Sequence, residues 1–514
     1  MQILKKLIVF SLLVSVASPI FGQLKSDIYP VKREETPETW KRDGWAALDS
    51  KKNQKKPKRR AKNVILFIGD GMGVSTLTAA RIFEGQLRGE SGEENRLSFE
   101  EFPYSALSKT YQANQQTPDS APTMSSIITG VKTDEGIISV NQNVRHGDYT
   151  TVAGNEAKTL VEYAEESGLS TGVVSTARIT HATPAACYGH SASRDWESDA
   201  DIFSRSKPAY DAKFPDLARQ LIETKYGDGL EVAMGGGRSK FIPKETRDPE
   251  YPARNGERLD GRDLPAEWTR KYKDSAYIWN KQQFDAIDAK KTKHLLGLFE
   301  PSHMKYDFDR PKDTAGEPSL SEMTSKAIDV LSNNKKGYVL MVEGGRIDHA
   351  HHDGNAFRAL TDAVALSNAV RTAVQKVNLE ETLIIVTADH SHTFFIQGYP
   401  GRGNNITGLV RQIDNKGDQE KEPKLDLNKK PFTTLGYSNG TGARKGERPT
   451  LTETEVTSPN YKQEANIPLS GETHGGEDVA IFAIGPNADL IRGSMEENWT
   501  FYVMADALRL ARKK

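Results

Sequence analysis

Five short apolar runs, interleaved with helical patterns, constrain the fold of this 514-residue chain more than any other feature. The runs begin at residues 63, 172, 337, 383 and 479, and helical patterns lie at 74–88, 157–166, 320–331 and 355–377. Buried parallel strands have continuous apolar sequences, and strands that alternate with helices form a largely parallel sheet. We therefore predict an α/β fold with a doubly wound, largely parallel central sheet flanked by helices.

The run that starts at residue 337 leads directly into a dense group of reactive side chains. The segment Val342–Asn355 holds three carboxylates, three histidines and an arginine. Asp348 and His352 are four positions apart, so a helical turn would place both on one face, where they can share a cation. Glu343 ends the predicted strand, and α/β sheets place their chemistry at the carboxyl ends of strands. The segment therefore predicts a metal site at this edge of the sheet.

Candidate partners for this site lie next to other apolar runs. Asp70 follows the first run, Asp389 and His390 follow the fourth, and His474 precedes the last. Carboxylate and imidazole ligands together suit zinc, and an oxygen-rich neighbouring site suits magnesium. Taken singly, an aspartate at a strand end can be a helix cap and a lone histidine can be structural, so the prediction depends on their joint occurrence.

A nucleophile and an anion-binding residue are suggested by two further segments. Ser120 lies two residues before Pro122, and proline is favoured in the first turn of a helix. A serine at a helix N-terminus can hold an alkoxide or a phosphate, although the same pattern fits a simple cap by Asp119 and Ser120. Arg194 can hold two phosphate oxygens, or it can be an ordinary surface arginine.

The N-terminus predicts export. Lys5 and Lys6 precede an apolar run at 7–17 and small residues near Gly22, which is the layout of a secretory signal at residues 1–22. The run is too short to span a bilayer, the C-terminus has no anchor signal, and the formal net charge is −1. We expect an exported, periplasmic or secreted protein with no membrane anchor and no nucleic-acid-specific binding. Cys187 is the only cysteine, so an internal disulfide is excluded.

The rest of the chain divides into an arm, a core and an insertion. Residues 23–62 predict an N-terminal helical arm and a basic linker. The core is predicted at 63–399 and 466–514, and the polar segment 400–465 is typical of an inserted subdomain. Strand signals become sparse between residues 194 and 336, which predicts an extended excursion from the core.

Together these motifs resemble the alkaline phosphatase family, in its animal-type branch, but without its disulfides and lipid-anchor tail. The resemblance runs from about Asn63 to the last helix, and six ordered motifs carry it: Gly69-Asp-Gly-Met-Gly, Asp119-Ser-Ala, Ala182-Thr-Pro-Ala-Ala, Val342-Glu-Gly-Gly-Arg-Ile-Asp-His, Thr387-Ala-Asp-His-Ser-His and Glu472-Thr-His-Gly-Gly-Glu-Asp. It implies hydrolysis of small phosphate monoesters through a phosphoserine, two Zn²⁺ ions, one Mg²⁺ ion and a homodimer with a crown-like insertion.

The resemblance also implies roles for individual residues. The first zinc would be held by Asp348, His352 and His474. The second would be held by Asp70, Asp389, His390 and Ser120, and the magnesium by Asp70, Thr183 and Glu343.

The remaining roles concern catalysis and the substrate. Ser120 would be the nucleophile, and Arg194 would bind phosphate, oriented by Asp119. His349 would contact phosphate through water. His181 stands where the best-known bacterial enzymes have an aspartate, which implies a weaker negative field at the magnesium and a more loosely held third metal.

A calcium site is the last expectation that the resemblance brings. Its ligands would be Glu250, Glu300, the carbonyl of Phe299 and Glu317. An aspartate is usual at the position of Glu317, so a calcium-free surface loop is the alternative.

Two other kinds of protein remain as alternatives. The nearer alternative is a phosphodiesterase or another hydrolase of the same superfamily, although a diesterase would be expected to lack the third-metal residues and Arg194. A sulfatase is disfavoured, because its nucleophile segment needs an arginine that the sequence Ser120-Ala-Pro-Thr-Met lacks. A catalytically inactive metal-binding homologue would have no need of Ser120 and Arg194.

Overall fold

The computed structural model describes residues 36–444 and 446–510, so the predicted signal at 1–22 lies outside the described residues. The chain forms two compact units, residues 1–54 and 55–514. In the first unit, helix α1 (Pro37–Lys52) begins after Thr36, whose side chain forms a reciprocal capping box with Thr39. None of the described helices is long and apolar enough to cross a membrane.

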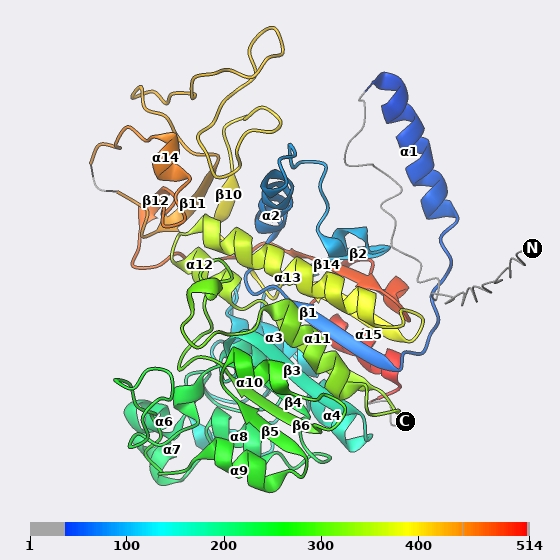
Figure 1. The fold of residues 1–514 in the computed structure, drawn as a ribbon, viewed down its shortest axis with the longest axis vertical. Coiled ribbons are helices and arrows are strands. Elements are labelled where there is room, and N and C mark those ends of the chain that lie inside the picture. Colours follow the sequence, from blue (N-terminus) through cyan, green and yellow to red (C-terminus); the bar gives the residue numbers. More distant parts are fainter. Residues whose placement is uncertain (1–35, 445, 511–514) are drawn as a thin grey trace, which may run out of the picture. The chain divides into compact units, whose positions relative to one another are not determined.

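A large sheet forms the centre of the second unit and confirms the predicted α/β class (Figure 1). Among the described residues its strand order is β15-β2-β14-β8-β1-β7-β3-β4-β6-β5. Neighbouring strands are parallel, except that β14 is antiparallel to both β2 and β8. The strands span β1 Asn63–Ile68, β2 Tyr104–Lys109, β3 Ser170–Arg178, β4 Val232–Gly236, β5 Ser275–Ile278, β6 His294–Leu298, β7 Tyr338–Glu343, β8 Thr382–Thr387, β14 Val479–Ile484 and β15 Gly493–Glu496.

The five predicted apolar runs correspond to β1, β3, β7, β8 and β14. The prediction for residues 194–336 was wrong, because β4, β6 and β5 lie in this stretch and extend the central sheet. These strands have only four or five residues each, and β4 and β6 contain glycine. Such short segments carry too little apolar periodicity to be recognised without their neighbours in the sheet.

Helices cover both faces of the sheet, as the doubly wound arrangement requires (Figure 1). Helices α2 (Val74–Leu87), α11 (Leu320–Leu331) and α13 (Ala356–Lys376) pack together on one face. Helices α3 (Ser120–Thr129), α4 (Leu160–Glu166) and α15 (Trp499–Leu508) pack against the core on the other. The remaining helices are α5 Ala182–Ala185, α6 Asp199–Arg205, α7 Lys207–Asp211, α8 Leu217–Glu223, α9 Leu264–Lys271, α10 Lys281–Ala286, α12 Arg346–His352 and α14 Glu453–Val456, with 3₁₀ turns at 98–101, 149–151, 238–240, 310–312 and 488–490.

Two small sheets lie beyond the carboxyl end of the central strands. Strands β10 (Phe394–Ile396), β11 (Leu435–Gly440) and β12 (Ala465–Pro468) form a three-stranded sheet (Figure 1). Strand β11 lies within the predicted insertion at 400–465, whereas β10 precedes it and β12 begins at its last residue. Strands β9 (Ser391–His392) and β13 (His474–Gly475) form an antiparallel pair that places His392 opposite His474. The three-stranded sheet is called the small sheet below.

Candidate active site

The central strands β1, β7 and β8 end at the same level, which brings the residues at their ends together. In the parallel register, Ile68 pairs with both Glu343 and Thr387. Asp70 therefore emerges beside Glu343 and Asp389, which come from distant parts of the sequence. Gly71, between them, has a φ of +66°, and a Cβ there would lie 2.4 Å from the ring of His392, so only glycine fits this turn.

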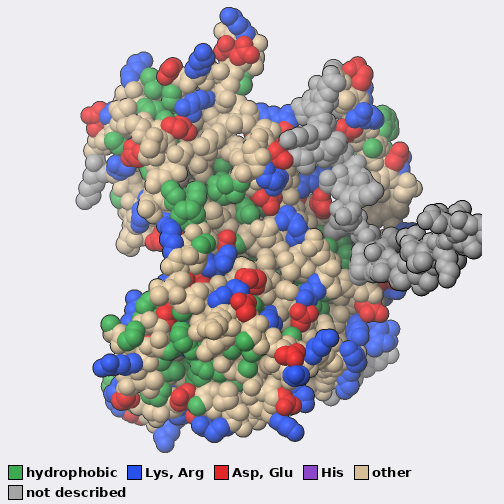
Figure 2. Space-filling model, in the orientation of Figure 1, with side chains coloured by type: hydrophobic (Ala, Val, Ile, Leu, Met, Phe, Trp, Pro, Cys, Tyr) green, Lys and Arg blue, Asp and Glu red, His purple; other side chains and the backbone are tan. Residues whose placement is uncertain are grey.

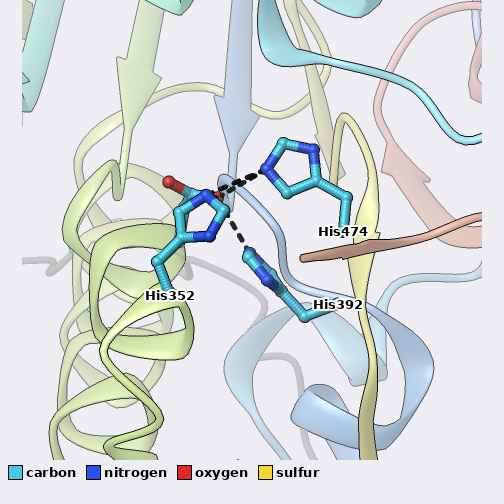
Figure 3. A group of neighbouring side chains, drawn as sticks. His352, His392 and His474 are labelled. Carbon is cyan, nitrogen blue, oxygen red and sulfur yellow. Dashed lines mark hydrogen bonds and ion pairs between the residues drawn. The ribbon is translucent and has the colours of Figure 1, made fainter. Parts of the chain in front are cut away.

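The first cluster of metal-ligating groups joins α12 to the β9–β13 pair (Figure 3). It consists of Asp348, His352, His392 and His474, whose ligand atoms all lie within 4.8 Å of one another. Asp348 Oδ1 lies 2.8 Å from Nε2 of His392 and 3.3 Å from Nε2 of both His352 and His474. The structure thus brings together the three residues predicted for the first zinc and adds His392.

Two backbone carbonyls fix which nitrogen of these imidazoles faces the cluster. His352 Nδ1 lies 2.6 Å from the carbonyl oxygen of Glu472, and His474 Nδ1 lies 2.7 Å from that of Pro118. A carbonyl can only accept, so each Nδ1 carries a proton and each Nε2 is the nitrogen that faces the cluster. Once Nε2 loses its proton, each ring is the tautomer that a metal ion requires.

Two further clusters share Asp70. One consists of Asp70, Asp389 and His390, and the other of Asp70, His181 and Glu343. Ser120, the first residue of α3, places its Oγ 3.0 Å from His390 Nε2 and 3.5 Å from Asp70 Oδ1. The residues predicted for the second zinc therefore surround the predicted nucleophile.

Buried oxygen atoms without partners show that these clusters fit cations. Asp70 Oδ2, Glu343 Oε1 and Thr183 Oγ1 are buried and have no hydrogen-bond partner. Burial, followed by the charges of Asp389, Asp348 and Glu343, raises the pKa of Asp70 well above its usual value. Burial also raises the pKa of Glu343 to about 7. Because burying unpaired carboxylates costs several kcal/mol, a hard cation between these oxygens would remove a large penalty.

Arg194, His181 and His349 form a connected group next to Asp119, the residue before Ser120. Arg194 forms an ion pair with Asp119 and donates from NH2 to Nε2 of His181 at 3.0 Å. The ring centroid of His349 lies 5.3 Å from that of His181. The start of α3 adds its backbone amides and its helix dipole at Ser120, which together favour an anion there.

Two histidines of this region were missed by the sequence interpretation. His392 lies in the Thr387–His392 motif and pairs with His474, so its signal was present but it was assigned no role. His303 packs against His349 with ring centroids 4.0 Å apart. It comes from the loop after β6, and no motif there marked it.

A separate acidic cluster lies where the calcium site was predicted. Glu250, Glu300 and Asp313 have carboxylate oxygens within 4.8 Å of one another, and Asp313 was not predicted. Glu317 lies next to this group: its Oε1 accepts from the backbone N–H of Lys305 at 2.9 Å, and its buried Oε2 has no hydrogen-bond partner. Phe299 directly precedes Glu300, and its backbone N–H donates to Gly235 in β4 at 2.9 Å.

The acidic cluster already has counter-charges from the chain itself. Lys305 Nζ lies 2.8 Å from Glu300 Oε1, and Arg238 lies 3.1 Å from Glu250 Oε2. Arg238 is fully buried and also holds Asp248 at 2.7 Å. This cluster therefore differs from the first three, each of which includes at least one imidazole.

A largely parallel sheet with convergent carboxylate, imidazole and serine groups at its carboxyl edge is the arrangement of a metal-dependent hydrolase built on an α/β fold. The family model described as alkaline phosphatase matches residues 61–510, which is most of the chain. The chain belongs to the alkaline phosphatase family and is a phosphoric monoester hydrolase.

Individual relatives agree with this assignment. The tissue-nonspecific alkaline phosphatase of Gallus gallus is 43% identical over 497 residues, which cover 95% of this chain and 92% of that protein. The human tissue-nonspecific isozyme is 43% identical over 493 residues, which cover 94% of this chain and 90% of that protein. Both comparisons span nearly the whole chain.

Solved structures confirm the fold. The alkaline phosphatase of the Antarctic bacterium TAB5 has a TM-score of 0.60 at 21% identity and covers 88% of this chain and 100% of that one. The enzyme of Thermus thermophilus has a TM-score of 0.62 at 22% identity and covers 90% of this chain and 94% of that one.

Proposed function

We propose that the monoesterase reaction takes place at the carboxyl ends of β1, β7 and β8, with Ser120 as the nucleophile. The observation that carries this proposal is the position of Ser120 Oγ, 3.0 Å from His390 and 3.5 Å from Asp70, at the start of a helix. Side chains that could hold cations lie around that oxygen, and Arg194 is held by Asp119, the residue before Ser120. A phosphate group placed there would meet both kinds of positive charge.

The donor sets favour zinc at two clusters and magnesium at the third. Asp348, His352 and His474 would hold one Zn²⁺, with His392 hydrogen-bonded to Asp348 from behind. Asp70, Asp389 and His390 would hold the second Zn²⁺ together with Ser120. The unpartnered oxygens of Asp70, Glu343 and Thr183 suit Mg²⁺, which prefers oxygen ligands. The bound cations would supply charge that lowers the pKa of the serine hydroxyl and stabilises developing negative charge on oxygen.

The chain's own residues then divide the work of a double displacement. Ser120 attacks phosphorus, the bond to the leaving alkoxide breaks, and water later hydrolyses the phosphoserine. Arg194 binds the non-bridging oxygens, and its ion pair with Asp119 fixes its orientation. His181 accepts a hydrogen bond from the same guanidinium, which limits its rotation further. The start of α3 favours the negative charge that Ser120 must carry.

Comparing ester classes with and without chelation tests this function. We expect rapid hydrolysis of an aryl phosphate monoester at alkaline pH, much slower hydrolysis of the matched methyl aryl diester, and loss of both after chelation. Added zinc and magnesium should restore the monoesterase. Comparable turnover of the diester would instead favour a phosphodiesterase, and activity that survives complete metal removal would refute the metal-dependent mechanism.

The magnesium site invites a test at His181. This histidine is neutral, because burial and then the charge of Arg194 lower its pKa well below its usual value. His181→Asp would add a negative charge beside Asp70 and Glu343, and we expect it to tighten magnesium binding by about tenfold to a hundredfold. A magnesium titration followed by activity measures the effect, with His181→Asn as the uncharged control. Equal affinities in both variants would contradict this interpretation.

The acidic cluster is proposed as a calcium site with Asp313 as a ligand. Glu250 and Glu300 converge with Asp313, whereas Glu317 stands next to the group, with one unpartnered oxygen. Calcium would have to compete with Lys305 for Glu300, which predicts modest affinity. A calcium titration that compares Asp313→Asn with Glu317→Gln would rank the two residues. No calcium binding by the wild-type protein would leave the cluster as a purely ionic network.

Export and dimerisation remain proposals that rest on the sequence. The segment at residues 1–22 has the layout of a secretory signal, and the arm at 23–62 resembles the dimerisation arm of the family. N-terminal sequencing of the mature protein and sedimentation of the holoenzyme test the two proposals separately.

A further inference from the structure

His351 is the histidine of the 342–355 segment to which the mechanism gives no role, yet it is completely buried. Both of its ring nitrogens are occupied. Nε2 lies 2.9 Å from Thr76 Oγ1, and Nδ1 lies 2.8 Å from the hydroxyl of Tyr437. With neither nitrogen available to a metal ion or a substrate, His351 must act through its neighbours.

The most informative neighbour of His351 is His392. The two ring centroids are 4.8 Å apart and the ring planes are tilted by 32°, so the two rings lie against each other. His392 in turn lies 2.8 Å from Asp348 Oδ1 through Nε2 and 2.5 Å from Glu472 through Nδ1. The ring of His351 thus packs against the ring of His392, which is hydrogen-bonded to Asp348.

The other end of this arrangement belongs to the small sheet. Tyr437 lies on β11, is 1% exposed, and packs on Phe394 of β10 with ring centroids 5.2 Å apart. Its hydroxyl is the only polar atom of its side chain, and it is directed at His351. Thr76, on the opposite side, belongs to α2 on the face of the central sheet. His351 therefore bridges the small sheet and the helical layer at the level of the first cluster.

The small sheet reaches the first cluster by a second route as well. Asn439 and Thr473 exchange two hydrogen bonds of 2.8 and 3.0 Å, and Thr473 directly precedes His474. Gln463 also donates to the carbonyl of Gly354 at 2.9 Å and accepts from the backbone of Ala356 at 2.8 Å. The turn that follows His352 is thereby attached to the segment that leads into β12 of the small sheet.

We propose that His351 is a positioning residue which, held by Tyr437 and Thr76, fixes the plane of His392 and with it the carboxylate of Asp348. The small sheet then determines how tightly the first cluster holds its metal ion. This inference rests on the proposed function, since it requires zinc at Asp348, His352 and His474. Groups that orient a ligand from behind commonly change metal affinity by about tenfold to a hundredfold.

The sharpest test removes a single hydroxyl. Tyr437→Phe keeps the ring that packs on Phe394 and His351 but leaves one nitrogen of His351 without its partner. Tyr461→Phe is the matched control, because Tyr461 lies in the same segment of the chain, is also buried, and has a hydroxyl without a hydrogen-bond partner. The measurement is the rate at which zinc is released from the holoenzyme into excess chelator. The kinetic phase that is lost in His352→Ala is the release of zinc from the first cluster.

We expect Tyr437→Phe to speed that phase about threefold to tenfold, which is the effect of one buried hydrogen bond, and Tyr461→Phe to leave it unchanged. Thr76→Val removes the hydrogen-bond partner of the other nitrogen of His351 and should speed zinc release by a similar factor. The loss of activity in dilute zinc should be rescued by excess zinc, with KM for the monoester unchanged. A purely structural role would lower Tm without a selective change in one zinc phase and without this rescue.

Two results would overturn the proposal. One is equal zinc release from Tyr437→Phe and Tyr461→Phe. The other is full additivity of Tyr437→Phe and His351→Phe in the zinc-release rate, because groups that act through one bridge must couple. Failure of the proposed function would look different: the wild-type protein itself would then contain no zinc or would not hydrolyse monoesters.

Discussion

The two ends of the central sheet both bury carboxylates of like charge, and they accommodate them differently. At the carboxyl end, Asp70 and Glu343 each keep a buried oxygen without a partner. At the amino end, Glu231 accepts from Ser170 Oγ at 2.8 Å and from the backbone N–H of Thr171 at 2.6 Å, while Glu165 accepts from the hydroxyl of Thr171 at 2.5 Å. Donors thus reach three of the four carboxylate oxygens at the amino end, where only Glu165 Oε2 has no partner, and two of the four at the carboxyl end.

The titration behaviour of the amino-end pair shows how it tolerates its charge. Burial, together with the charge of Glu231, raises the pKa of Glu165 to about 9, and burial raises the pKa of Glu231 to about 7. The pair therefore retains a proton at neutral pH. Among the described residues, no group of three metal-ligating side chains includes either glutamate. Convergence of a third ligand, above all an imidazole, is what distinguishes a metal site from a carboxylate pair that shares a proton.

The largest expected effect is on kcat, which should depend on a serine at the carboxyl end of the sheet and not on one at the amino end. Ser120→Ala removes the proposed nucleophile, and we expect kcat to fall at least about a thousandfold. Ser170→Ala removes a buried serine at the amino end of the sheet, whose hydroxyl donates to Glu231. We expect its kcat to stay within about twofold of the wild-type value and its free energy of unfolding to fall by about 1 kcal/mol. Steady-state kinetics and thermal unfolding of both variants measure this. A comparable loss of kcat in the two would remove Ser120 from its proposed role.

The next effect is on the free energy of unfolding, which should respond to bound metal at the carboxyl end of the sheet and not at the amino end. In the metal-free protein, Asp70→Asn relieves like-charge repulsion in a buried site, so we expect it to raise the free energy of unfolding by about 1–3 kcal/mol. In zinc and magnesium the same variant should be less stable than the wild-type protein, because it loses the stabilisation that metal binding gives. Glu231→Gln should show no such change of sign. The free energy of unfolding is measured in chelator and in metal buffer. If Asp70→Asn changes it in the same direction under both conditions, charge repulsion does not control this site.

Much of the carboxyl end was predictable because strand ends in parallel sheets meet. Asp70, Glu343 and Asp389 each follow an apolar run, and level strand ends bring them together whatever the loops do. His303 and Asp313 were not predictable, because they reach their clusters from long loops whose paths depend on tertiary packing. His351 shows a third case: its sequence position suggested no specific role, and only the structure reveals Thr76 and Tyr437 on its two nitrogens.

The fold was predicted least well at its edge. Strands β4, β6 and β5 are short, and the long connections between them carry most of the polar residues of that region. Their pairing depends on the register set by β3, which pairs with β4 through Val173 and Ala233 among others. Local sequence contains no information on such pairing, whereas the central runs are apolar enough to be recognised alone.

The smallest expected effect concerns the proton at the amino end. The folded-state pKa of Glu165, about 9, lies above the usual carboxyl value, so the folded protein binds more protons than the unfolded chain between these limits. Stability should therefore fall as pH rises toward 9, by at most about 1.4 kcal/mol for each pH unit. Glu165→Gln cannot ionise, and we expect it to flatten this slope and to exceed the wild-type stability most clearly near pH 9.

A neighbouring residue supplies the control for Glu165→Gln. Glu166 follows Glu165 in α4, its side chain is 50% exposed, and it pairs with Lys158 at the surface, so Glu166→Gln should leave the slope unchanged. Urea unfolding of the metal-loaded protein at several values between pH 6.5 and 9.5 gives the three slopes. If Glu165→Gln and the wild-type protein differ by the same amount at every pH, the buried pair does not hold a proton. The two ends of the sheet would then have to be distinguished by hydrogen bonding alone.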